Sequence, residues 1–299
     1  MENFKRIDYI NNLDKLNIKK VFELDRPTIQ TMPFIFASPH SGTNYINSFI
    51  TASKLSRLAL RSSEDSFVDD LYSDVVNCGA PLLKAIFPRA YIDLNREAYE
   101  LDQEMFKEQL PKFVNTSSSR IAAGLGTIPR IVANGDEIYH DKISFEEAEK
   151  RIKFYYHPYH AMLQNLIDET KQKFDKCILI DCHSMPSSST GQDGSNKNQH
   201  IDVVLGNKHG TTCAPGLIDF IEFHLTNLGL IVRRNHPYAG GYTTQHYGNP
   251  KSGVHTLQIE INRSIYMDEQ THTHSSGFFQ LKEKILSLIM ALKMEYFTF

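Results

Sequence analysis

Several features are scarce or absent in this sequence of 299 residues, and each absence excludes a class of protein. The four cysteines form no Cys-x-x-Cys pair and no disulfide-like framework, which favours a reducing, cytoplasmic location. No long segment is rich in lysine or arginine and the net charge is only −3, so nucleic acid is not an expected partner. No apolar run approaches the length of a transmembrane helix, and the N-terminal residues lack the apolar core of a signal peptide. Neither membrane insertion nor export is therefore expected.

Familiar nucleophile and nucleotide motifs are also missing. The chain contains no Gly-x-Ser-x-Gly elbow, no P-loop and no dinucleotide fingerprint after a strand. Cys182 stands beside His183, but adjacent residues of a strand point to opposite faces, which favours a buried structural cysteine over a thiol nucleophile. His157 and His160 are interpreted as helix-packing or lid residues, since no acidic residue stands next to them.

What is present is an ordinary globular composition, with 41% hydrophobic and 22% charged residues. Strands alternate with helices without repeats or a linker, which predicts one α/β/α domain over residues 1–299. A long irregular insertion is expected around 97–140. Strands are predicted at 33–38, 81–87, 91–94, 177–183, 201–205, 230–234 and 256–261. Helices are predicted at 66–78, 144–174 with a bend near Pro158, 215–228 and 277–296.

Two of the predicted strands end in histidine. His40 follows the first strand, and His183 ends a buried run, Cys177-Ile178-Leu179-Ile180-Asp181-Cys182-His183. In α/β sheets, ligands bind beside the carboxyl ends of strands. Together with an acidic residue from Ser63-Glu64-Asp65, two imidazoles match the protein ligands of a catalytic zinc site. The alternative is that each histidine is only a hydrogen-bonding residue at a strand end.

Two further groups of polar residues have the chemistry of a substrate site. Arg89, Asn95 and Arg96 suit a substrate carboxylate, although they could equally be surface residues that pair with nearby acids. Glu260 lies in a β-like run, where a buried carboxylate without a partner is costly. It is therefore exposed in a cleft, paired, for example with Arg263, or functional as a general base beside a metal site.

These clusters resemble the N-formylglutamate amidohydrolase family, which is part of the zinc carboxypeptidase and aspartoacylase-like group. The similar segments run in order along residues 33–268: Ser38-Pro39-His40-Ser41-Gly42, Asp65-x-x-Val68-Asp69-x-Leu71-Tyr72, Asp93-Leu94-Asn95-Arg96, Asp181-Cys182-His183-Ser184, Val204-Leu205-Gly206-Asn207-Lys208-His209-Gly210, Asn235-x-Pro237-Tyr238-Ala239-Gly240-Gly241, His246-Tyr247-Gly248-x-Pro250 and Gln258-Ile259-Glu260-Ile261-Asn262-Arg263. The resemblance implies a three-layer α/β/α fold with a mixed central sheet, of the zinc carboxypeptidase-like kind.

The resemblance also implies a role for individual residues. His40, Asp65 and His183 are the expected ligands of Zn²⁺ or another divalent metal, with Glu64 as the substitute acidic ligand. Glu260 is the expected catalytic base, and Arg89 the group that polarises the scissile carbonyl. Asn95 and Arg96 are expected to hold the substrate carboxylate, and Tyr247 to line the pocket within a Gly/Tyr-rich loop.

The implied activity is metal-dependent hydrolysis of the N-formyl or N-acyl amide of an acidic amino acid, foremost N-formyl-L-glutamate. The expected partner is therefore a small N-acyl amino acid, and nothing in the sequence bears on the number of subunits. Two other functions are compatible with the same residues. One is a zinc peptidase or peptidoglycan amidase, and the other is a non-catalytic carboxylate-binding protein of the same fold.

Overall fold

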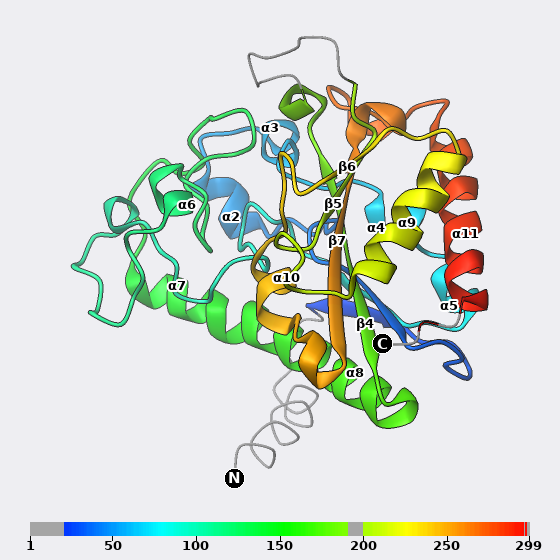
Figure 1. The fold of residues 1–299 in the computed structure, drawn as a ribbon. Coiled ribbons are helices and arrows are strands. Elements are labelled where there is room, and N and C mark those ends of the chain that lie inside the picture. The colour runs from blue at the N-terminus through cyan, green and yellow to red at the C-terminus, as the bar shows by residue number, and fades with distance from the viewer. Residues whose placement is uncertain (1–20, 191–199, 296, 298–299) are drawn as a thin grey trace. The chain divides into compact units, whose positions relative to one another are not determined.

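The computed structural model describes residues 21–190, 200–295 and 297 (Figure 1). Their contacts divide the chain into two compact units. Unit 1 contains the described residues of 1–23, together with 39–64 and 84–166, and unit 2 contains 24–38, 65–83 and the described residues of 167–299. That the two units make up one domain stays a prediction. None of the helices in the described ranges combines the length and the apolar character needed to cross a bilayer.

A mixed sheet is the centre of the fold, as the family resemblance implied, and it has seven strands. Its order is β1-β3-β2-β4-β7-β5-β6. The strands are β1 (Phe22–Asp25), β2 (Phe34–Ser38), β3 (Leu82–Ala85), β4 (Cys177–Met185), β5 (Val203–Gly206), β6 (Val232–Arg234) and β7 (Val254–Asn262). β4 pairs in parallel with both β2 and β7, whereas β5 runs antiparallel to β7. The long buried strands β4 and β7 thus lie side by side in the middle of the sheet.

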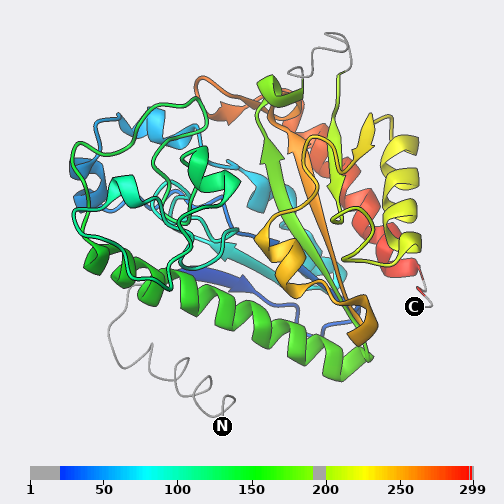
Figure 2. The same ribbon diagram turned by 60° about the vertical axis from the view of Figure 1, so that its left-hand side comes forward.

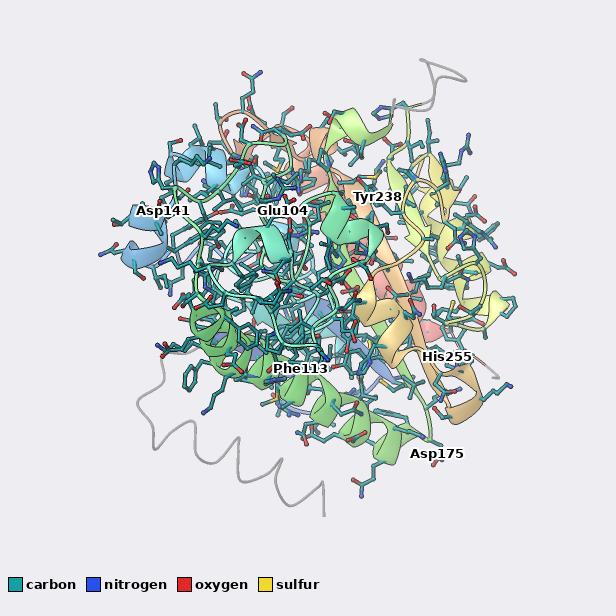
Figure 3. The ribbon with its side chains drawn as sticks, turned by 90° about the vertical axis from the view of Figure 1, so that its left-hand side faces the viewer. Glu104, Phe113, Asp141, Asp175, Tyr238 and His255 are labelled. Carbon is teal, nitrogen blue, oxygen red and sulfur yellow. The ribbon has the colours of Figure 1, made fainter. Side chains whose placement is uncertain are left out.

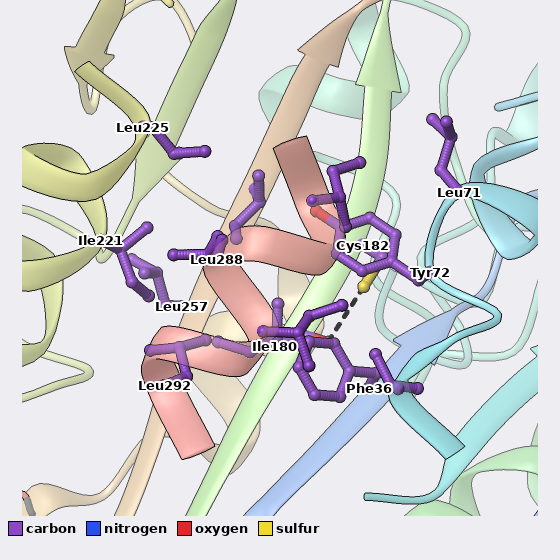
Figure 4. Packing of buried hydrophobic residues seen from close by; sticks show 14 of the residues in the cluster. Phe36, Leu71, Tyr72, Ile180, Cys182, Ile221, Leu225, Leu257, Leu288 and Leu292 are labelled. Atoms are coloured by element: carbon purple, nitrogen blue, oxygen red, sulfur yellow. Dashed lines mark hydrogen bonds between the residues drawn. The ribbon is translucent and has the colours of Figure 1, made fainter. Parts of the chain in front are cut away.

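One face of this sheet carries the main hydrophobic core. Successive strand residues point to opposite faces, so Ile178, Ile180 and Cys182 of β4 lie on the same face as Leu257 and Ile259 of β7. All five belong to one buried cluster with residues of the helices α4 (Val68–Leu71), α5 (Val75–Cys78), α9 (Pro215–Asn227) and α11 (Phe278–Met294), and Figure 4 shows part of it. Figures 1 and 2 both show α9 and α11 on the same side of β4 and β7. The opposite face of the two strands is therefore available for polar residues.

The helix predicted over residues 66–78 is broken into α4 and α5. Phe67, the residue before α4, has a left-handed backbone with φ of 65° and ψ of 5°. Non-glycine residues rarely adopt this conformation, and α4 begins only after this sharp turn, while turn residues 72–74 separate α4 from α5. The periodicity of Phe67, Leu71 and Val75 therefore indicated a buried face correctly but gave the wrong continuous helix.

The helix predicted from Ser144 begins as expected. The Ser144 hydroxyl accepts a hydrogen bond from the Glu147 backbone N–H at 3.2 Å and caps α7 (Phe145–Arg151). A π-helical turn, Ile152–Tyr156, then joins α7 to α8 (His157–Phe174). The irregularity precedes Pro158, because proline donates no hydrogen bond to the preceding turn and its ring crowds that turn.

Unit 1 is mostly irregular but has its own core. Its remaining helices are α2 (Asn47–Ala52), α3 (Arg57–Arg61) and α6 (Ser119–Ala122), with a 3-10 turn at Gln103–Met105. Leu101, Phe106 and Ile128 are buried together in the segment between residues 97 and 140. The side chain of Phe113, which is labelled in Figure 3, packs edge-on against Tyr99 in the same segment, with ring centroids 5.1 Å apart.

The strand predicted at residues 91–94 does not form. Tyr91, Ile92 and Leu94 are buried, which accounts for their apolar pattern. The Asp93 backbone N–H donates to the Thr127 carbonyl at 2.7 Å, and the Asp93 carboxylate accepts from the Asn95 backbone N–H at 2.8 Å. This local side-chain bond favours a turn over a strand.

Candidate active site

In unit 2, the carboxyl end of β4 presents its polar side chains on the face opposite the main core. His183 and Asp181 share this face, and Cys182 lies in the apolar cluster on the other side (Figure 4). His183 Nε2 lies 2.9 Å from Asp181 Oδ1, and His183 Nδ1 lies 3.0 Å from Asp65 Oδ2. All three side chains are buried. One imidazole is thus held between two carboxylates.

Asp65 is fixed by a further contact within unit 2. The Arg263 guanidinium donates from Nη2 to Asp65 Oδ1 at 2.9 Å and from Nε to Ser184 Oγ at 3.2 Å. Each oxygen of Asp65 therefore has its own neighbour, Arg263 on one side and His183 on the other. Arg263, considered above as a partner for Glu260, is thus a partner of Asp65.

The charges around His183 favour its protonated form. Burial disfavours a charged imidazole, but Asp181, Asp65 and Glu260 together outweigh it, so the pKa of His183 stands well above its usual value. The three carboxylates thus favour positive charge at His183, which either a proton or a metal cation could supply.

Glu260 lies next to His183 across the two parallel strands. The register pairs His183 of β4 with Glu260 of β7, and paired residues of neighbouring strands share a face. The Glu260 carboxylate accepts a hydrogen bond from Gln258 Nε2 at 2.8 Å. The sheet therefore brings together Asp65, His183 and Glu260, three of the residues that the sequence predicted for the site.

In unit 1, Asp93 is the centre of a second network. Its Oδ1 lies 2.8 Å from His40 Nε2, and its Oδ2 accepts from Arg89 Nε at 2.9 Å. Arg96 Nη2 lies 3.5 Å from the same oxygen. Burial disfavours the carboxylate, but Arg89, Arg96 and His40 more than compensate and hold the pKa of Asp93 well below its usual range. Unit 1 thus brings together His40, Arg89 and Arg96 around one aspartate.

Arg96 is more deeply engaged than its predicted role suggested. Its side chain is 4% exposed, and it donates from Nε to the Leu125 carbonyl at 2.8 Å and from Nη1 to the Asn95 carbonyl at 2.7 Å. Burial lowers its pKa to about 10, with Asp93 acting in the opposite direction. That Asn95 and Arg96 bind a substrate carboxylate stays a prediction.

The contacts of Glu64 distinguish it from Asp65. Its Oε1 accepts from the Tyr45 hydroxyl at 2.7 Å, and its Oε2 accepts from Arg61 Nε at 3.0 Å. Both oxygens of Glu64 thus take part in a network of unit 1, whereas Asp65 contacts a candidate metal ligand. Of the two acids, Asp65 is the better candidate for a metal ligand.

Tyr247 lies in α10 (Tyr242–Tyr247), a short helix in the Gly/Tyr-rich segment that was expected to be a loop. The Tyr247 side chain is buried, and its ring packs edge-on against His246 at a centroid distance of 4.8 Å. Tyr238, also in this segment, packs against Met185, Ile201 and Val204. Whether Tyr247 touches a substrate stays a prediction.

Two site residues were missed in the sequence. Asp181 lies two residues before His183 on a strand, so the shared face was readable from the alternation alone. Asp93 was considered only as an ion-pair partner, and its contact with His40 joins residues 53 apart in the chain, for which the sequence contains no local signal.

The donor set fits a zinc-type metal ion. His40 and His183 each place Nε2 against an aspartate, Asp93 and Asp181 respectively. Histidines that bind metals commonly donate their second ring nitrogen to a carboxylate, which fixes the tautomer. Nδ1 of each ring is then the nitrogen that would bind the ion, and in His183 this atom adjoins Asp65. Two imidazoles and one carboxylate form the protein ligand set of known catalytic zinc sites.

Comparison with known proteins gives a consistent result. The family profile described as N-formylglutamate amidohydrolase matches residues 32–267. The chain belongs to this family. It is 23% identical over 266 residues to an N-formylglutamate deformylase of Pseudomonas putida. This alignment covers 87% of this chain and 91% of that protein. It is 27% identical over 244 residues to that of Pseudomonas aeruginosa, covering 80% of this chain and 84% of the relative.

A solved structure supports the same assignment. The crystal structure of an N-formylglutamate amidohydrolase from Ralstonia eutropha JMP134 is 34% identical, with a TM-score of 0.86. The similarity covers 91% of this chain and 97% of that one. As a member of the N-formylglutamate amidohydrolase family, the chain shares an α/β fold with a protein of that name over nearly its whole length.

Proposed function

We propose that this protein hydrolyses the N-formyl amide of N-formyl-L-glutamate to glutamate and formate, with a divalent metal ion, foremost Zn²⁺, held by His40, Asp65 and His183. The family and the named relatives support the reaction. The observation that carries the proposal is the arrangement on the polar face of β4 and β7. There Asp65 contacts His183, and Glu260 is the cross-strand neighbour of His183.

The chain connections support His40 as the third ligand. β2 ends at Ser38 and pairs with β4 up to Ala37 and Asp181, so His40 follows the paired region by only three residues. Two residues of chain span at most about 7 Å, which limits how far His40 can lie from the end of β2. His40, Asp65 and His183 are each buried, and each offers an atom that can bind a metal ion.

When bound, the metal ion would supply Lewis acidity, which lowers the pKa of a water ligand and polarises a carbonyl oxygen. The protein residues supply the proton transfers. We assign Glu260 as the base that takes a proton from the attacking water and then delivers it to the nitrogen of the leaving amine. The C–N bond breaks as that nitrogen receives the proton, and formate and the free amino acid are the products.

The arginines have separate roles in the proposal. Arg89 would stabilise the oxyanion that develops on the formyl oxygen, and its salt bridge to Asp93 orients the guanidinium. Asn95 and Arg96 would hold the substrate carboxylate, since a guanidinium matches a carboxylate in shape and charge. Tyr247 would line the substrate pocket.

A substrate panel tests this function. Zinc-loaded protein is assayed for formate and free amino acid with N-formyl-L-glutamate, N-acetyl-L-glutamate and N-formyl-L-leucine. We expect equal amounts of formate and glutamate from the first compound, and a much lower kcat/KM for the leucine compound, which lacks the second carboxylate. Glu260→Gln, which keeps the side-chain shape, is expected to lose turnover while it retains zinc. Normal turnover of Glu260→Gln, or none of the wild type on any of the three compounds, would refute the proposal.

A further inference from the structure

Gln258 lies on β7 two residues before Glu260, so both side chains are on the polar face of the sheet. Both are buried, at 3% and 9% exposure. Gln258 Oε1 accepts a hydrogen bond from the Gly241 backbone N–H at 2.7 Å. A backbone N–H can only donate, so this contact fixes which end of the amide is oxygen. The amide nitrogen therefore points the other way, and Nε2 donates to Glu260 Oε1 at 2.8 Å.

The other end of this hydrogen-bond chain is the start of α10. Gly241 is the N-cap residue of α10 and, as a glycine, has no side chain that could cap the helix. Gln258 Oε1 takes the Gly241 N–H and also lies 3.4 Å from the Thr244 hydroxyl. One amide thus joins the segment that carries Tyr247 to the carboxylate of Glu260.

The backbone approaches the strands closely at this point. A Cβ atom added to Gly206 of β5 would lie 2.6 Å from the Gly240 backbone nitrogen, so the glycine is needed for the fit. The segment before α10 therefore packs directly on the sheet beside Gln258. A shift of this segment would move the acceptor end of the Gln258 amide.

We propose that Gln258 is a positioning residue that holds Glu260 for proton transfer and links its orientation to the position of α10. The inference rests on the proposed function, in which Glu260 is the base. A donor on Oε1 disfavours protonation of that oxygen, so the proton of the attacking water passes to Oε2 of Glu260. The O–H bond of the water breaks as the Oε2–H bond forms, and the proton later leaves with the amine.

Two substitutions separate positioning from a purely structural role. Gln258→Glu keeps an oxygen that can accept from Gly241 but cannot donate to Glu260 when ionised. Gln258→Met has a similar length, carries no charge and removes both contacts. If Gln258 positions Glu260, both variants lose kcat by about 10- to 100-fold, with KM for N-formyl-L-glutamate changed by less than about threefold and bound zinc unchanged.

The matched control is Gln30→Met. Gln30 donates from Nε2 to the Met32 and Phe34 carbonyls, both at 3.2 Å, and to the Thr170 hydroxyl at 3.0 Å, at the amino-terminal end of β2. The same substitution there is expected to lower the melting temperature and leave kcat unchanged. It measures the cost of losing a bridging glutamine that has no contact with Glu260.

The outcomes also separate this inference from the proposed function. A kcat within twofold of wild type in either Gln258 variant would overturn the positioning role, and so would a loss that appears only in KM. If Glu260→Gln is inactive while the Gln258 variants are active, only this inference fails. If Glu260→Gln keeps normal turnover, the proposed function itself fails.

Discussion

The imidazole Nδ1 of His183 lies 3.0 Å from the carboxylate Oδ2 of Asp65, although 118 residues separate the two in the chain. The contact depends on the sheet and on the left-handed turn at Phe67. β4 delivers His183 to the polar face, and the turn directs the chain from Asp65 into α4. The relationship joins a predicted histidine to a predicted acid, and it is the basis of the proposed metal site.

Asp65 and Glu64 give a first prediction. Asp65→Asn is expected to lower zinc affinity by more than about 100-fold, because a neutral amide is a poor metal ligand. It also removes the carboxylate that pairs with the buried Arg263 guanidinium, at a cost of about 3–5 kcal/mol in the free energy of unfolding. Zinc competition with a chelator and urea denaturation measure the two effects.

Glu64→Gln is the matched control for Asp65→Asn and should retain zinc, because Glu64 contacts Tyr45 and Arg61. Loss of zinc from Glu64→Gln alone would reverse the assignment.

Cys182 gives a second prediction, which concerns the rival thiol chemistry. The thiol is buried in the apolar core, and burial raises its pKa well above the usual value. A reactive thiolate is therefore not available, and Cys182→Ala should keep kcat within about twofold. The lost core volume should reduce the free energy of unfolding by about 1–2 kcal/mol in urea titrations. Abolished turnover in a folded, zinc-loaded variant would restore the thiol mechanism.

Gly42 gives a third prediction. A Cβ atom there would lie 2.3 Å from the Phe87 carbonyl oxygen and 2.4 Å from the Ile86 carbonyl carbon, which are backbone atoms that cannot rotate away. Gly42→Ala should destabilise the protein by about 1–3 kcal/mol and lower zinc affinity, because His40 lies two residues away. Thermal melts and zinc competition measure these effects. Gly216→Ala in α9 is the control, since nothing lies within 4 Å of its added Cβ. It should be neutral or stabilising, and equal losses in both variants would contradict this account.

The fourth prediction is a pH dependence of stability. His255 is buried, and its Nδ1 accepts a hydrogen bond from the Ala214 backbone N–H at 3.1 Å. Burial, helped by Lys176, lowers the pKa of His255 from 6.5 to about 4. Between these values the unfolded chain binds more protons than the folded one, so this contribution to stability is lost as the pH falls from about 6.5 to about 4.

His255→Asn isolates this contribution, because an asparagine oxygen can also accept from the Ala214 N–H. Urea titrations at pH 7 and pH 5 should show a smaller loss of stability in the variant than in the wild type. An identical loss in both proteins would show that His255 is not the titrating group.

Much of the site was predictable because it lies at strand ends. His40 and His183 follow apolar runs that are buried by the sheet, and the alternation along β4 separates His183 from Cys182. These are local signals with a period of two residues. That the sheet is mixed followed from the family resemblance rather than from the local pattern.

The remaining features depend on contacts between distant segments. The Asp93 side chain binds the Asn95 backbone and His40, and this turned a predicted strand into a turn. Arg263 follows Glu260 closely in the chain, yet its Nη2 binds Asp65, 198 residues away. Propensity and periodicity describe a residue's own neighbourhood, so neither predicts which distant carboxylate a buried arginine will bind.

The most direct test of the account is a zinc titration of metal-free protein, with formate release from N-formyl-L-glutamate as the readout. The account predicts no turnover in the metal-free protein and a rise that saturates at about one zinc per chain. A His40→Ala/His183→Ala variant should stay inactive throughout the titration. Full turnover without metal, or an active double variant, would contradict the central claim that these residues form a catalytic metal site.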